Sequence, residues 1–185
     1  MWPRRPPGIE LPSSSNSGRA AAVLILIYPV DGAPYLALTR RTETVQNHKG
    51  QISLPGGAHE GNETITQTAL REANEELAVI TSGVELLGTL TPVYIGVCDY
   101  LITPVVAIAT QRPDFRPDPL EVVEAIEIPL SLLLDPAARS EEDWEIRGFS
   151  VHVPFFSVGP HKVWGATAMI LAEFAALLEQ ALAEH

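Results

Sequence analysis

Apolar residues occur along this chain in short runs that are separated by glycine, proline and polar residues. The run at residues 20–28 is continuous and aliphatic, which is typical of a buried central strand. Asp31 and Gly32 predict a turn, after which residues 35–39 return as a second strand. Further strands are predicted at 51–54, 84–91, 101–109 and 121–129. Pro104, in the middle of one of these, predicts an edge position or a bulge.

Helical spacing is clearest in the segment that begins at Ile65. Thr64 and Gln67 have the spacing of a capping box, so a helix is predicted to begin near Ile65. The stripe that is predicted to face the core consists of Thr66, Leu70, Ala73 and Leu77.

The last third of the chain alternates in the same way between strand and helix patterns. A short helix is predicted at 130–134, a hairpin around Gly148 within 144–157, and a long helix rich in alanine and leucine at 163–183 that packs on the sheet. The mixture predicts an α/β fold.

Length and composition predict one domain. With 185 residues, of which 46% are hydrophobic, the chain is long enough to bury a substantial core. Residues 1–18 are rich in proline and serine and are predicted to be an irregular lead-in to a domain at 19–185. No apolar run suits a signal peptide or a membrane span, and the single cysteine, Cys98, excludes an intrachain disulfide. These features predict a cytoplasmic protein that does not bind membranes.

The charge of the chain restricts its partners. A net charge of −11 and a pI near 4.8 argue against a protein that binds nucleic acid. The same charge would repel an anionic small molecule, unless bound cations meet its phosphates.

Three glutamates lie close together in the predicted helix at 65–77. At about 100° per residue, Glu72, Glu75 and Glu76 fall on one face. Carboxylates so close repel one another unless something neutralises them. The cluster is therefore either a solvated acidic face or a site for a hard divalent cation such as Mg²⁺.

The spacing around these glutamates resembles the Nudix box, G-x5-E-x7-R-E-U-x-E-E-x-G-U, in which U is apolar. The matching positions are Gly57, Glu63, Arg71, Glu72, Glu75, Glu76 and Val79. The second glycine of the box is Ala78 here, at a place where a positive φ is often needed. The resemblance implies a Nudix fold, with a mixed β-sheet sandwiched between α-helices. It also implies hydrolysis of a nucleoside diphosphate linked to another group.

The stretch before the box resembles a narrower signature, L-L-T-x-R-[SA]-x3-R-x3-G-x3-F-P-G-G, of coenzyme A diphosphatases. The fitting positions are Leu38, Thr39, Arg41, Gly50, Pro55, Gly56 and Gly57, and the departures are Ala37, Thr42, Gln46 and Leu54. Gln46 removes a positive charge, for which we consider Lys49 or Arg40 as a substitute. The resemblance implies release of 4′-phosphopantetheine and adenosine 3′,5′-bisphosphate.

The two resemblances assign roles to individual residues. Mg²⁺ or Mn²⁺ would be held by the Gly56 carbonyl, Glu72, Glu75 and Glu76. The catalytic candidates are Glu72, Glu75 and Glu121; Glu72 is the first choice of base and Glu121, from outside the box, the second. The substrate-binding candidates are Arg41, Lys49, Gly50 and Arg71, although Arg71 is better placed to orient a carboxylate. Glu63 is interpreted as a structural partner of Arg71.

Two other functions fit the same residues. One is a diphosphatase of ADP-ribose, NADH or another nucleotide diphosphate, and the other is a Nudix module that binds a nucleotide without cleaving it. The expected partner is in each case a small nucleotide diphosphate. Nudix folds often form homodimers, although no segment of the sequence indicates an interface.

Overall fold

The protein is described by a computed structural model that covers residues 18–42, 50–146 and 148–184, without the side chains of Ile146 and Phe149. Lys49 and Gln46, which the sequence analysis singled out, lie outside these residues. The helices are α1 (Ile65–Leu77), α2 (Leu130–Leu134) and α3 (Gly165–Ala183), with 3₁₀ turns at Thr81–Gly83 and Pro136–Ala138. The strands are β1 (Arg19–Val30), β2 (Ala33–Arg41), β3 (Ile52–Ser53), β4 (Gly56–Ala58), β5 (Val84–Thr89), β6 (Val93–Ile95), β7 (Tyr100–Ala109), β8 (Val122–Pro129), β9 (Arg139–Ile146), β10 (Phe149–Val158) and β11 (His161–Trp164).

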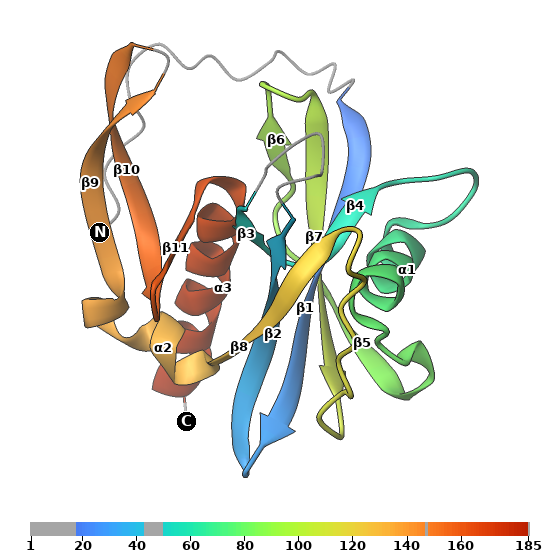
Figure 1. Ribbon diagram of the computed structural model, residues 1–185. Helices are drawn as coiled ribbons and strands as arrows, with labels where there is room; N and C mark the ends of the chain where they lie inside the picture. The colour runs from blue at the N-terminus through green and yellow to red at the C-terminus, as the bar shows by residue number, and fades with distance from the viewer. Residues whose placement is uncertain (1–17, 43–49, 147, 185) are drawn as a thin grey trace.

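The larger sheet has eight strands, and β1 lies in its middle (Figure 1). Its main order is β3-β2-β1-β7-β5, while β4 pairs with β1, β6 with β7 and β8 with β2. β1 and β7 are parallel and the other pairs are antiparallel, so the sheet is mixed. The continuous apolar run that predicted a central strand is therefore explained by β1, which is buried on both faces.

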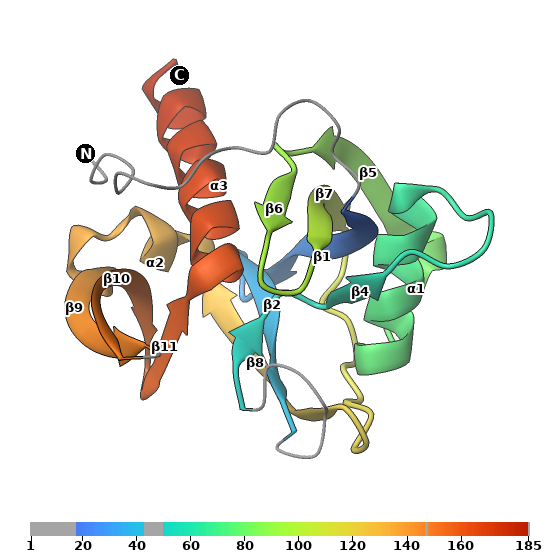
Figure 2. The same cartoon turned by 90° about the horizontal axis from the view of Figure 1, so that it is seen from above.

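Helices cover both faces of this sheet (Figures 1 and 2). On one face, Ala69, Ala73 and Leu77 of α1 pack against Leu24 and Leu26 of β1 and their neighbours. On the other face, α3 and α2 share a core with the alternate residues of β1 and β2 and with the second sheet. The predicted α/β sandwich is confirmed.

The second sheet is antiparallel and has the order β11-β10-β9. The predicted hairpin is present, with Gly148 at φ +79° between β9 and β10. The predicted start of the last helix is wrong, because Val163 and Trp164 pair with β10 as part of β11 and α3 begins at Gly165. Trp164 packs edge-to-face on Trp144, with ring centroids 5.3 Å apart, and so anchors β11 to β9.

Neither alternative predicted at Pro104 is present there: β7 is not an edge strand, and the irregularity in the β5–β7 pairing lies between Leu86 and Gly88. β7 lies between β1 and β5, and Pro104 is opposite Val23. On the other side of β7, the β5 ladder ends at Val105 and the β6 ladder begins at Ile102. Pro104 falls in the gap between the two ladders, where a strand can tolerate a residue without an N–H. Its carbonyl accepts the N–H of Leu90.

Among the described residues, one helix, α3, is long and apolar enough to cross a membrane, with a mean hydropathy of 1.4. Ile170, Leu171 and Phe174 are nevertheless buried in the core beneath the sheet. One side of α3 therefore packs on the sheet, as the sequence predicted, whereas Met169, Leu177 and Leu182 are exposed and 28% of the apolar stretch is buried.

Candidate functional site

The helix α1 begins and ends as its local sequence dictates. The Thr64 hydroxyl accepts the N–H of Gln67, and the Gln67 side chain accepts the N–H of Thr64, so the predicted capping box is present. At the other end, Ala78 adopts the left-handed conformation at φ +56° and donates its N–H to Asn74. The alanine therefore takes the geometry that a glycine would provide, at a cost in strain.

The buried stripe of α1 differs from the predicted one. Ala73 and Leu77 are buried as expected, but Thr68, Ala69 and Glu76 are buried as well, whereas Thr66 is only half-buried. The helix is thus rotated so that Glu76 faces the sheet, where its side chain is 1% exposed. The small side chains of Ala69 and Ala73 allow the helix to lie close to β1.

The two glycines of β4 bring its backbone close to α1 and β1. A Cβ on Gly57 would lie 2.4 Å from Glu72 Oε1, and a Cβ on Gly56 would lie 2.3 Å from the carbonyl oxygen of Ala22. Neither position tolerates a side chain without movement of the backbone. The Gly56 N–H donates to Glu76 Oε2 at 3.3 Å. The two glycines of β4 therefore allow the carboxylates of Glu72 and Glu76 to lie against this strand.

Arg71 occupies the exposed side of the glutamate cluster. Its guanidinium donates to both oxygens of Glu63, to Glu72 Oε1 at 2.8 Å and to Glu75 Oε2 at 2.9 Å. A fifth hydrogen bond goes to the carbonyl of Ala58. The predicted pairing of Arg71 with Glu63 is confirmed. These five bonds use all five N–H groups of the guanidinium. Arg71 is therefore fixed in place and orients the carboxylates that it binds.

Arg41 reaches the same cluster from the end of β2. Its Nη1 donates to Glu76 Oε1 at 3.0 Å and its Nη2 to Glu121 Oε2 at 3.3 Å. Glu121 lies just before β8, and its carbonyl accepts the N–H of Thr42. The fold thus brings together Arg41, Glu76 and Glu121, which are far apart in the sequence.

Arg40, the neighbour of Arg41, does not belong to this cluster. Successive residues of a strand point to opposite faces, and Arg40 Nε donates to Glu124 Oε1 at 2.6 Å, close to His161 of β11. Within the described residues Arg40 pairs with Glu124 rather than with the cluster, which does not support its interpretation as a substitute for the missing arginine at Gln46. Gly50 lies beside Gln51, whose carbonyl accepts the Arg41 N–H at 3.0 Å.

The carboxyl groups of the cluster differ in the direction in which their pKa values are shifted. Burial raises the pKa of Glu76 above its ordinary value, and the Arg41 guanidinium opposes this rise. Burial also raises the pKa of Glu72, although Arg71 opposes it. The hydrogen bonds from Arg71 lower the pKa of Glu63 to about 2. Glu63 is therefore a fixed anion, whereas Glu72 and Glu76 hold protons more readily than ordinary glutamates.

The donor atoms of the cluster suit a hard divalent cation, since carboxylate and carbonyl oxygens are the ligands that Mg²⁺ and Mn²⁺ prefer. Yet no group of three acidic, histidine or cysteine side chains in the described part of the chain is arranged to hold a metal ion. The reason lies in the two arginines: Glu72 and Glu75 point to Arg71, and Glu76 points to Arg41. The residues fit a cation by their chemistry, and their oxygens face guanidinium groups instead.

Sequence reasoning missed the contribution of the loop between β7 and β8. The Arg116 N–H donates to the Leu77 carbonyl and the Asp118 N–H to the Glu76 carbonyl, at 3.0 and 2.9 Å. These bonds satisfy carbonyls at the end of α1 and bring the chain to Glu121. No local sequence pattern predicts these bonds. They join backbone groups, which every residue except proline has in full, and they form only because the fold brings the two segments together.

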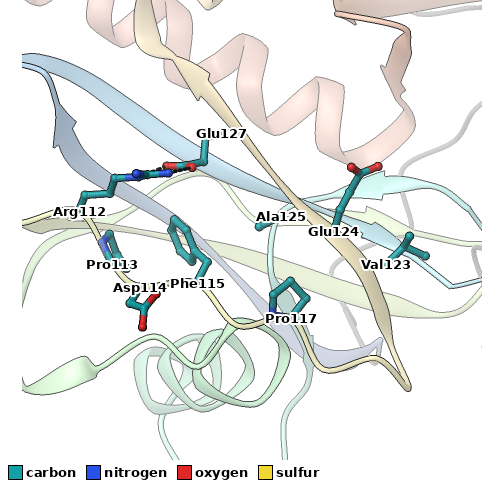
Figure 3. A pocket seen from close by; sticks show the side chains of 9 residues that line it. All are labelled: Arg112, Pro113, Asp114, Phe115, Pro117, Val123, Glu124, Ala125 and Glu127. Carbon is teal, nitrogen blue, oxygen red and sulfur yellow. Dashed lines mark hydrogen bonds and ion pairs between the residues drawn. The ribbon is translucent and has the colours of Figure 1, made fainter.

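The same loop and β8 enclose a groove of about 560 Å³ (Figure 3). Phe115, Pro117 and Ala125 supply apolar walls, and Arg112 forms a two-bonded ion pair with Glu127 at one end. Phe115 packs edge-to-face on Tyr28, with centroids 5.3 Å apart. No residue of the glutamate cluster lines this groove, so the two are separate; Glu124, the less favoured alternative to Glu121 as a carboxylate from outside the box, does line it.

Comparison with known proteins places this arrangement in a family. The sequence model of one family, described as the NUDIX domain, matches residues 18–146. A protein of Photorhabdus laumondii named "Uncharacterized Nudix hydrolase NudL" is 37% identical over 162 residues, which are 87% of this chain and 86% of that protein. A protein of the same name from Escherichia coli O6:H1 is 39% identical over 158 residues, 85% of this chain and 81% of that protein.

Among solved structures, a Caenorhabditis elegans Ap4A hydrolase in a binary complex has a similar fold. The TM-score is 0.58 with 14% sequence identity, and the match covers 88% of this chain and 98% of that chain. At this identity the likeness concerns the fold alone.

Proposed function

Because this chain belongs to the NUDIX family, and is therefore a hydrolase that acts on pyrophosphate bonds, we propose that it cleaves the diphosphate of coenzyme A or its derivatives. The products would be 4′-phosphopantetheine and adenosine 3′,5′-bisphosphate. The observation that carries this proposal is the stretch from Leu38 to Gly57, which resembles the coenzyme A diphosphatase signature. In support, Arg41 of this stretch contacts two carboxylates of the cluster.

Nudix hydrolases generally need divalent cations, and we propose Mg²⁺ or Mn²⁺ held by the Gly56 carbonyl, Glu72, Glu75 and Glu76. A bound cation supplies positive charge to the diphosphate oxygens and lowers the pKa of a coordinated water. With a net charge of −11, the protein needs this positive charge before an anionic substrate can approach.

Two carboxylates compete for the role of general base. Glu72 lies against Gly57 with its side chain 14% exposed, and burial raises its pKa, which makes it a stronger base than an ordinary carboxylate. Glu121 is half exposed and is bound by Arg41. We propose Glu72 as the base, Glu75 as a supporting carboxylate and Glu121 as the second candidate. Comparing the pH profiles of kcat for E72Q and E121Q tests the choice, because loss of the base removes the acidic limb of the profile.

The substrate side of the site is proposed to consist of Arg41, Gly50 and Lys49, with Arg71 as a positioning residue. Arg41 has a planar guanidinium that matches a phosphate, and its side chain is 21% exposed. Every N–H of the Arg71 guanidinium is already bound to protein, so we do not assign it a direct substrate contact.

A second candidate is a diphosphatase of ADP-ribose or NADH, which the replacement of an arginine by Gln46 favours. Loss of that charge fits a substrate without a 3′-phosphate. The alternative of a module that binds without cleaving does not hold, because the chain is a hydrolase.

Product analysis by mass spectrometry separates the two substrates. The protein with Mg²⁺ would receive coenzyme A, ADP-ribose and NADH in separate reactions. Adenosine 3′,5′-bisphosphate formed fastest, and only with metal, is the expected result. AMP from ADP-ribose or NADH, with coenzyme A intact, would transfer the assignment to the second candidate.

The remaining proposals concern the localisation, the partners and the oligomeric state of the protein. We propose a cytoplasmic enzyme whose partner is a small nucleotide diphosphate and which binds neither nucleic acid nor membrane. The sequence leaves the oligomeric state open between monomer and homodimer, and light scattering coupled to gel filtration decides it: a mass of 20.0 kDa at micromolar concentration would exclude the homodimer.

A further inference from the structure

Arg41 and Arg71 both bind the glutamate cluster, but they are held to different degrees. Arg71 makes five hydrogen bonds to protein acceptors. Within the described residues, the Arg41 guanidinium makes two, to Glu76 at 3.0 Å and to the half-exposed Glu121 at 3.3 Å. Moving the Arg41 side chain out of the cluster therefore breaks fewer hydrogen bonds than moving that of Arg71.

The Arg41 guanidinium binds Glu76 Oε1, an oxygen that a cation held by Glu76 would need. Glu76 has one carboxylate oxygen on the Gly56 N–H and the other on Arg41. A divalent cation and a guanidinium cannot both lie against the latter oxygen, since like charges at contact distance repel. This competition also explains why the described acidic side chains do not converge on a metal position.

While Glu76 is ionised, as most of it is at pH 8.5, neither positive charge can leave it without the other arriving. The Glu76 side chain is 1% exposed, and an ionised carboxylate at such a position is strongly unfavourable without a partner. Once displaced, the guanidinium needs an anion at the mouth of the site. A diphosphate offers two phosphates, which match the planar fork of arginine better than the single carboxylate of Glu121 does.

We propose that Arg41 is an exchangeable countercharge: it neutralises Glu76 in the metal-free protein, and it moves to the substrate diphosphate when a divalent cation takes its place. This inference rests on the proposed metal-dependent function and adds to it a coupling between the two ligands. Because coupling between two sites is reciprocal, the diphosphate tightens cation binding and the cation tightens diphosphate binding.

The test measures Mg²⁺ binding by calorimetry at pH 8.5, with and without α,β-methylene-ADP, a diphosphate that resists hydrolysis. R41Q is compared with R40Q, which removes the same charge from the neighbouring residue on the opposite face, where it pairs with Glu124. Chelation of Mg²⁺ by the nucleotide in solution is the same for every variant, so differences between variants report the protein.

We expect R41Q to bind Mg²⁺ alone more tightly than wild type, by about threefold to tenfold, since the competing charge is gone. We also expect the nucleotide to tighten Mg²⁺ binding about tenfold in wild type and R40Q, and to have little effect in R41Q. R41K, which retains a charge on Glu76 without the planar fork, should bind Mg²⁺ as wild type does and lose most of the coupling. It provides the answer if R41Q does not fold.

Equal behaviour of R41Q and R40Q, or full coupling in R41K, would overturn the exchange while leaving the proposed function intact. A wild-type protein that binds no Mg²⁺, with or without the nucleotide, would overturn both proposals.

Discussion

Glu76 shows at the scale of one residue how this protein combines burial with charge. Its position in the helix places it on the buried face beside Ala73 and Leu77, yet its carboxylate bonds to Gly56 and Arg41. A glutamine of nearly the same size would keep the packing and remove the charge. Two predictions follow from this property.

Replacing Glu76 by Gln should lower kcat/KM by about a thousandfold or more, because a ligand that holds the cation contributes several kcal/mol to the transition state. The measurement is steady-state hydrolysis with Mg²⁺ and the best substrate. E85Q, which changes an exposed glutamate of β5, serves as the control and should retain wild-type activity. Full activity of E76Q would remove the glutamate cluster from the metal site.

The metal-free protein should lose stability as the pH rises above about 4.5, the ordinary pKa of a glutamate. The pKa of Glu76 is higher in the folded than in the unfolded state. Its contribution is therefore complete below pH 4.5 and is lost as the pH passes through the raised value. The loss attributable to Glu76 is at most about 1.4 kcal/mol per pH unit.

Urea unfolding in EDTA at pH 5, 6, 7 and 8 measures this loss. E76Q has no carboxyl group at this position, so its stability should fall less than that of wild type over the same range. Parallel curves for the two proteins would show that the Glu76 proton does not contribute.

At the scale of the element, the local sequence of α1 favours the conformation that the fold gives it, except at Ala78. Its capping box, its length and its glutamate face follow from the sequence between Thr64 and Leu77. Its end does not, since Ala78 adopts a left-handed conformation that is unfavourable for any residue with a Cβ. The helix end is held in place by the loop bonds from Arg116 and Asp118.

Replacing Ala78 by Gly should therefore stabilise the protein by about 1 kcal/mol, because glycine adopts a positive φ without strain. A change of this size raises Tm by about 2–4 °C in a protein of this length, as thermal unfolding would measure. A176G in α3 provides a matched control: the same substitution at an exposed helical position should lower Tm by a similar amount. A lower Tm for A78G would mean that the alanine side chain contributes packing at the helix end.

At the scale of the molecule, the site connects elements that pack into two different hydrophobic cores, one on each face of the larger sheet. α1 belongs to the core on one face of the larger sheet, and β2, which carries Arg41, contributes to the cores on both faces. A ligand that binds β4 and α1 together therefore stabilises the whole fold. The extent depends on the ratio of ligand concentration to Kd.

Mg²⁺ at about 100 times its Kd should raise Tm by about 5–10 °C, which corresponds to about 2.7 kcal/mol. Excess EDTA should reverse this shift, whereas KCl of equal ionic strength should not reproduce it. E72Q is predicted to respond less than wild type, because it lacks one of the three carboxylates. A Tm that is insensitive to Mg²⁺ would contradict a cation site that includes the buried Glu76.

Sequence alone determined the features that depend on neighbouring residues. The helix start at Ile65, the central strand and the glutamate face were predicted, because helix and strand periods are local properties. The broad family followed from the same part of the chain, since the box extends from β4 to the end of α1.

Only the tertiary structure decided which charges meet when they are distant in the sequence. The packing of α1 and the strands brings Arg41 to Glu76 across 35 positions of sequence and to Glu121 across 80, and it buries Glu76. It also turns Arg40 away and places Pro104 in a gap between two ladders. Local patterns cannot fix such contacts, because the free energy that selects them comes from burying both faces of a sheet whose strands are distant in the chain.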